Sequence, residues 1–122
     1  FSWDDDTWPI KPDFVMEGGN LARAPSGRID GCDDVALLTT TLEPLGRLLT
    51  YSSDTSAATA LASQSAASIM ADYPNLWPET VRALLVHSAE WTPEMVRQVP
   101  GKNQADIQKR LRCFGYGVPD ME

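Results

Sequence analysis

Basic residues are scarce in this chain. It has 10 lysines and arginines against 17 aspartates and glutamates, which gives a formal net charge of −7. Binding to nucleic acid depends on clustered basic side chains that neutralise phosphates, and an acidic balance disfavours it. The sequence therefore predicts no nucleic-acid partner.

Long apolar runs are absent as well. The longest uncharged stretch, residues 55–71, is too short and too rich in Ser, Thr and Gln to insert into a bilayer. We therefore expect no membrane partner. No signal peptide opens the chain, but a leader could have been removed together with a preceding segment, so the sequence leaves localisation open.

Cysteine and histidine are too few to suggest a metal site. Cys32 and Cys113 lie far apart without CxxC or Cys-His spacing, so neither a metal nor another cofactor is predicted. The two cysteines are compatible with one disulfide or with two free thiols. We favour free thiols, which are typical of intracellular proteins. The acidic run Asp4-Asp5-Asp6 lacks the alternating spacing of a calcium loop, so we interpret it as a solvated turn.

The stretch around which the chain is organised is residues 55–71. It carries no charge, and Ala, Ser and Thr fill nearly every helical turn, which predicts a helix that other elements enclose on most sides. A short apolar run at residues 47–51 and a polar turn at residues 52–55 precede it. This order places Ser56 at the N-terminus of the helix.

A serine in that position has two plausible roles. The first N–H groups of a helix have no intrahelical partner, so the hydroxyl could attack a carbonyl while the N–H of Ser56 stabilises the oxyanion. Alternatively Ser56, or Thr55 or Asp54 before it, is an ordinary N-cap, since Ser, Thr and Asp are the commonest caps. Spacing alone does not decide between these two roles.

The segment that begins Asp54-Thr55-Ser56 also resembles a known motif. It is similar to the Gly-Thr-Ser-x-Ala-x-Pro segment of the subtilisin-like serine proteases, and Ser56 matches their nucleophile. Two residues depart from the pattern, since Asp54 replaces the glycine and Ala60 replaces the proline. Aspartate tolerates tight, positive-φ backbone less well than glycine does, so the first change concerns the geometry of the turn.

Four further blocks support the resemblance in the same order along the chain. They are Phe1-Ser2, the Lys11-Pro12-Asp13 segment that runs to Gly19, the helical segment of residues 78–89, and Gly115-Tyr116-Gly117 near the C-terminus.

The resemblance implies an α/β chain with a partial subtilisin-like fold, in which short strands lead into a buried serine-bearing helix and two further helices follow. Because the chain begins at Phe1 without Met, and such catalytic domains are roughly twice as long or more, we expect residues 1–122 to be the C-terminal part of one catalytic domain.

The implied function is serine endopeptidase activity in the parent protein. The resemblance places the family's catalytic Asp and His and its oxyanion Asn upstream of Phe1, so the isolated chain is expected to be inactive. The implied partners are a peptide or protein substrate and the remainder of the catalytic domain. A non-catalytic interaction or structural module, that is, a degenerate subtilase, is the alternative.

We also expect this piece of a catalytic domain to self-associate. Without the rest of a parallel sheet, its strand edges and apolar faces would be uncovered, and such surfaces tend to pair with another copy. His87 lies on the flank of a packing helix, and a triad built from it and Ser56 is disfavoured, because a lone helical histidine usually has a structural role. The charged residues Lys109, Arg110 and Arg112 are expected on a solvated face.

The local patterns predict the elements along the chain. In order, we expect a strand at 13–16, a Gly-rich polar loop at 17–34, a hairpin of 35–40 with 47–51, the serine helix, a helix at 78–89, a loop at 90–102 and a helix at 103–112.

Overall fold

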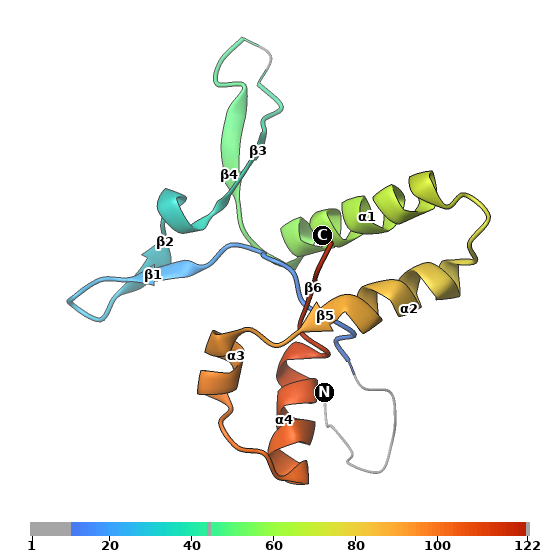
Figure 1. Cartoon of the computed structure of the whole chain (residues 1–122). Coiled ribbons are helices and arrows are strands. Elements are labelled where there is room, and N and C mark those ends of the chain that lie inside the picture. The colour runs from blue at the N-terminus through green and yellow to red at the C-terminus, as the bar shows by residue number, and fades with distance from the viewer. Residues whose placement is uncertain (1–10, 44, 122) are drawn as a thin grey trace. The chain divides into compact units, whose positions relative to one another are not determined.

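The computed structural model describes residues 11–43 and 45–121, which form a mixed α/β chain of short strands and helices (Figure 1). The chain divides into two compact units, Met16–Gln64 and a second unit that joins Phe1–Val15 to Ser65–Glu122. The Phe1-Ser2 match and the acidic turn at residues 4–6 lie outside the described residues, as does Pro44 in the expected hairpin turn.

The first hairpin of the unit Met16–Gln64 lies where the sequence predicts only a polar loop. Strands β1 (Leu21–Arg23) and β2 (Ile29–Gly31) pair antiparallel, and the 3-10 helix η1 (Asp33–Val35) follows. The turn forms because Gly27 adopts a φ of 86° and its N–H donates to the Ala24 carbonyl at 2.8 Å. The loop prediction for residues 17–34 is therefore wrong, since the glycine that suggested a loop closes a hairpin.

The second hairpin agrees with the sequence pattern. Strands β3 (Leu37–Thr40) and β4 (Leu49–Ser52) pair antiparallel with Leu37 opposite Ser52, about two residues later than the predicted runs begin. Figure 1 shows it as a ribbon separate from β1–β2. It leads through a short turn into the helix that carries Ser56.

Helix α1 (Thr55–Asp72) is the predicted serine helix, but none of its residues is buried. The expectation of a buried helix is therefore wrong for this chain. Small, uncharged side chains permit a helix to be enclosed, but they do not supply the elements that enclose it. Its half-buried residues form a single stripe, which comprises Ala57, Ala58, Leu61, Ala62, Ser65, Ala66 and Ile69.

In the second unit, helix α2 (Pro78–Ser88) supplies the core. The helix starts at the predicted residue with Pro78 in its first turn, and Val81 and Leu85 are buried, whereas Leu84 is 44% exposed. Strand β5 (Ala89–Glu90) then pairs antiparallel with β6 (Val118–Pro119).

Helix α3 (Pro93–Gln98) lies within the segment 90–102, for which the sequence analysis predicts a loop without regular structure. The Thr92 side chain caps it by accepting a hydrogen bond from the Met95 N–H, and Pro93 stands in its first turn. The prediction is wrong because a proline at the first helical position, directly after a threonine cap, starts a helix rather than breaking one.

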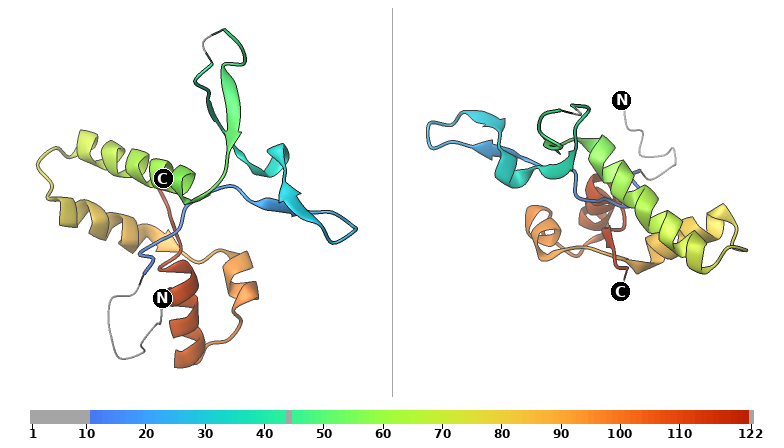
Figure 2. Two further views of the ribbon diagram at one scale, coloured as in Figure 1. Left: turned by 180° about the vertical axis from the view of Figure 1, so that it is seen from behind. Right: turned by 90° about the horizontal axis from the view of Figure 1, so that it is seen from above.

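Helix α4 (Gln104–Phe114) begins one residue after the predicted start, and the Asn103 side chain caps it by accepting the Asp106 N–H at 2.9 Å. Three helices therefore follow α1 among the described residues, where two were expected. Figure 2 shows α3 and α4 side by side in views from different directions.

Arg110 on α4 is buried, which contradicts its predicted place on a solvated face. Its guanidinium donates hydrogen bonds to the carbonyls of Val99 and Gly101 at 2.7 and 3.0 Å. It also lies 4.7 Å from the ring centroid of Trp91, whose indole N–H donates to the Gly115 carbonyl. The charge is tolerated inside because carbonyl dipoles and an aromatic face surround it.

Residues 11–15 contain no strand, although one was expected at 13–16. The segment is held by two backbone bonds, one from the Val15 N–H to the Gly117 carbonyl and one from the Tyr116 N–H to the Asp13 carbonyl, each 2.9 Å long. The residues opposite this segment form a turn at Gly115, which has a φ of 57° and lies so close to Asp13 that a Cβ there would collide with the Asp13 backbone. Because a turn does not continue the pairing, residues 13–16 do not form a strand.

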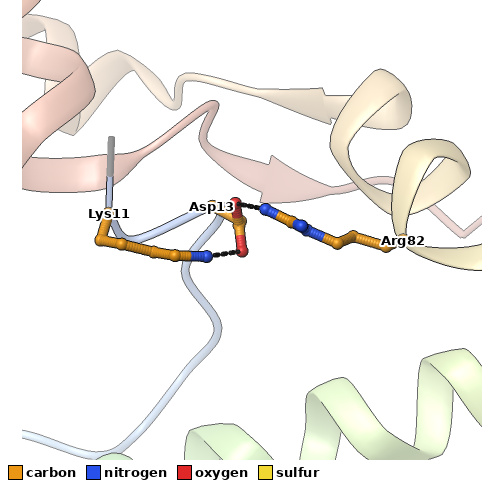
Figure 3. Close-up of polar contacts among 3 residues, drawn as sticks. All are labelled: Lys11, Asp13 and Arg82. Atoms are coloured by element: carbon orange, nitrogen blue, oxygen red, sulfur yellow. Dashed lines mark hydrogen bonds and ion pairs between the residues drawn. The ribbon is translucent and has the colours of Figure 1, made fainter. Parts of the chain in front are cut away.

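The Asp13 side chain attaches the same segment to α2. Its carboxylate accepts from the Lys11 ammonium and from the Arg82 guanidinium, each at 2.6 Å (Figure 3). Partial burial alone would raise the pKa of Asp13, but the hydrogen bonds and charges of Arg82 and Lys11 outweigh it and lower the pKa.

Candidate functional site

The candidate nucleophile Ser56 is the second residue of α1 and is exposed. It follows β4 after a turn of two residues, Ser53 and Asp54, and Thr55 opens the helix. The chain thus passes from strand to helix at this point and leaves the hydroxyl at the positive end of the helix dipole.

The turn before the helix requires an unusual backbone conformation. Asp54 has a φ of 111°, a region that side-chain-bearing residues rarely adopt and that glycine adopts freely. Its N–H donates to the Gly18 carbonyl at 2.7 Å, and its own carbonyl accepts the Ala57 N–H at 3.1 Å. Hydrogen bonds on both sides therefore hold Asp54 in this conformation.

Gly18 and Gly19 lie against the turn. A Cβ at Gly18 would approach the Asp54 carbonyl oxygen to 2.9 Å, and one at Gly19, whose φ is 76°, would approach the Ser53 Cβ to 2.8 Å. Both positions therefore need glycine for the close approach of two backbones. The glycine pair and the serine turn thus form one backbone assembly.

The hydrogen bonds around Ser56 differ from those of an N-cap. Among the described residues no backbone carbonyl accepts the Ser56 N–H, and the side chains of Asp54, Thr55 and Ser56 accept no backbone N–H. By contrast, the Thr92 and Asn103 side chains cap α3 and α4 directly. The Ser56 hydroxyl and N–H are both available to a ligand in this part of the structure.

A pocket of about 330 Å³ opens beside Ser56. It lies between the β3–β4 hairpin and the first turns of α1, and its walls contain apolar, hydroxyl and amide side chains but no charged one. The lining residues are Leu37, Leu38, Thr39, Ser52, Ser56, Ala57, Ala60, Leu61 and Gln64.

The other sequence candidates are a histidine and two cysteines. His87 is exposed near the end of α2, in the unit that does not contain Ser56. Cys32 and Cys113 are free thiols. Within residues 11–43 and 45–121, no group of three or more His, Cys, Asp or Glu side chains is arranged to hold a metal ion. Nor is any described helix long and apolar enough to cross a membrane.

A comparison with family models identifies the relationship. The model of the Subtilase family, a family of peptidases, matches residues 1–117. The chain belongs to the subtilase family. Its mixed strands and helices are compatible with part of a subtilisin-like fold, so the predicted fold class is confirmed.

One curated relative is similar over most of the chain. The uncharacterized protein y4bN of Sinorhizobium fredii (strain NBRC 101917 / NGR234) is 34% identical over 117 residues, which cover 92% of this chain and 26% of that protein. The chain thus spans about a quarter of the length of this relative. No solved structure matches.

Two features of this subtilase region escape sequence reasoning. The contact between Gly18-Gly19 and Ser53-Asp54 joins segments far apart in the chain, and no local pattern signals it. The positive φ at Asp54 had one available signal, which is the glycine that the family motif carries at that position.

Proposed function

We propose that Ser56 is the nucleophile of a serine endopeptidase, in the full-length protein that carries this chain. The observation that carries the proposal is that Ser56 is exposed in the first turn of α1 and that its N–H donates to no described backbone carbonyl. The chain that places the serine in this way is a member of the subtilase family. The Ser56 Oγ would attack the peptide carbonyl and form an acyl-enzyme. Its N–H would donate to the oxyanion that develops in that step.

The remaining catalytic groups would come from the rest of the catalytic domain, which is the first partner we propose. A histidine would take the proton of Ser56, an aspartate would orient that histidine, and an asparagine side chain would be the second oxyanion donor. Without them the serine hydroxyl is a weak nucleophile near neutral pH, so the isolated chain is expected not to hydrolyse peptides. Incubation with casein tests this, and turnover that depends on Ser56 would contradict it.

Labelling of the full-length protein with a fluorophosphonate tests the role of Ser56. We expect one adduct, on the peptide that contains Ser56, and none in Ser56→Ala. The matched control is Ser63→Ala, because Ser63 is an exposed serine of the same helix whose hydroxyl donates to the Thr59 carbonyl. Labelling should persist in this control. A properly folded full-length protein that takes up no reagent at Ser56 would refute the proposal.

A non-catalytic module is the second candidate. The two departures from the family motif, Asp54 and Ala60, favour it, because an aspartate held at positive φ strains the turn that presents the serine. This candidate predicts that the full-length protein binds a peptide or protein but is not labelled at Ser56.

A further inference from the structure

The pocket beside Ser56 has one wall on the β3–β4 hairpin and one on α1. Leu37, Thr39 and Ser52 share one face of the hairpin, because Leu37 lies opposite Ser52 and side chains alternate along a strand. This face forms the first wall. All the lining residues belong to the unit Met16–Gln64, so the pocket is a feature of that unit alone.

The second wall begins at the candidate nucleophile and follows one side of α1. Ser56, Ala60 and Gln64 succeed one another at intervals of four residues, which places them on the same side of the helix. At 1.5 Å per residue, the rise from Ser56 to Gln64 is about 12 Å. A peptide whose carbonyl lies at the Ser56 hydroxyl therefore has a neighbouring side chain within reach of the pocket.

The composition of the pocket suits an uncharged side chain. Leucine and alanine side chains supply its apolar surface, and none of its lining residues is charged. An aliphatic group gains free energy when it leaves water for such walls, whereas an ammonium or carboxylate group would lose hydration and find no opposite charge. The volume of about 330 Å³ lies at the lower end of the range for ligand pockets, which is about 300–1,000 Å³.

Ala60 is the lining residue that departs from the family motif. The motif has proline at this position, and a proline would add ring carbons at this wall. Ala60 is exposed and contributes only a methyl group. It therefore leaves open the part of the pocket that lies one helical turn from Ser56.

We propose that this pocket is a substrate subsite of the peptidase, which takes a large aliphatic side chain from a residue near the scissile bond, and that Ala60 leaves the room for it. This inference rests on the proposed function, since the substrate must reach the Ser56 hydroxyl. The subsite disfavours a charged residue at the same substrate position, because the charge would be desolvated against uncharged walls.

Quenched peptides hydrolysed by the full-length protein test the preference. They carry norleucine, lysine or alanine at each position within two residues of the scissile bond. Norleucine resembles lysine in shape but has no charge, and it is larger than alanine, so the set separates charge from size. At one of these positions we expect kcat/KM to be about tenfold higher for norleucine than for either of the other two.

Two substitutions at exposed positions of α1 change the pocket without replacing a buried residue. Ala60→Leu fills it and should bring the ratio of norleucine to alanine close to one. Gln64→Glu places a carboxylate in the wall and should reverse the order of norleucine and lysine. The matched control is Ala67→Leu, at an exposed alanine of the same helix outside the pocket lining, and it should leave both ratios unchanged.

Fluorophosphonate labelling at Ser56 separates the failure of this inference from the failure of the peptidase proposal. If Ser56 is labelled but the wild-type protein does not prefer norleucine, the inference about the pocket fails and the peptidase proposal stands. The same conclusion follows if the preference survives in Ala60→Leu. If the wild-type protein is not labelled, both fail.

Discussion

The two units of the chain are stabilised by different means. Every buried residue in the described structure belongs to the unit that contains α2, α3 and α4, and none lies between residues 16 and 64. The helical unit is stabilised by side chains, whereas the unit with Ser56 is held by strand pairing and by the backbone contact of Gly18-Gly19 with the serine turn. The buried residues are Val81, Leu85, Val99, Arg110, Gly115, Gly117 and Pro119.

This difference shows that the candidate chemistry lies in the part with the weaker core. Exposed leucines lie in the β3–β4 hairpin, and two of them in the connection between its strands, Leu42 and Leu45, are 97% and 101% exposed. Apolar surface of this kind is usually covered by another element or another chain. We expect the remainder of the catalytic domain to cover it, and the self-association expected of the isolated chain remains a prediction.

The largest expected effect is the loss of a core leucine. Leu85→Ala should destabilise the helical unit by about 3 kcal/mol, because it leaves a cavity under α2. Leu38→Ala, which truncates a side chain that is 60% exposed, should cost less than about 1 kcal/mol. Urea unfolding, with amide exchange read separately for residues 16–64 and 65–121, would compare the loss of unfolding free energy in the two variants. Equal losses would contradict the difference between the two units.

A smaller loss is expected from the buried cation. Arg110→Met should destabilise the helical unit by about 2 kcal/mol, because the carbonyls of Val99 and Gly101 lose their donor and the Trp91 ring loses its cation. Urea unfolding followed by far-UV circular dichroism is the measurement. Lys109→Met, on the preceding exposed position, is the control and should change stability by less than about 0.5 kcal/mol.

Relief of the backbone strain at Asp54 should stabilise the unit Met16–Gln64. Asp54→Gly is expected to gain about 1 kcal/mol, because glycine adopts the positive φ without strain. Exchange of the Ala57 amide, which donates to the Asp54 carbonyl, should slow by about fivefold. Asp54→Ala keeps a Cβ and should give no gain. If both variants stabilise equally, the charge of Asp54 rather than its backbone is the cause.

The smallest effect should come from the ion pairs of Asp13. The pKa of Asp13 is lowered in the folded chain, so the stability that these pairs contribute is present above the ordinary value of 3.8 and is lost as the pH falls through the lowered pKa. Arg82→Gln should therefore reduce stability at neutral pH and bring its curve together with the wild-type curve in acid. Thermal unfolding between pH 2 and 7 measures this, and a constant difference at every pH would contradict it. The effect should be small because both partners are partly exposed.

Some of the site was predictable because its signals are local. The family motif around Ser56 and the uncharged run after it predicted the serine at the start of α1. The role of the serine as nucleophile remains a proposal. The backbone conformation of Asp54 was predictable only in part. The motif shows that glycine is usual at this position, but not that the chain keeps the positive φ of glycine when aspartate replaces it.

The sequence by itself determined the β3–β4 hairpin and the starts of α1, α2 and α4, and its resemblance to known motifs indicated the family. The hairpin and the helix starts depend on turns, caps and periodicity within a few neighbouring residues, and the Asn103 cap is the clearest example. Only the tertiary structure decided that Arg110 is buried, that α1 has no buried residue and that Gly18-Gly19 lies against the serine turn. These features depend on segments that meet across long stretches of chain, where the free energy comes from packing and from the close approach of backbones rather than from local preference.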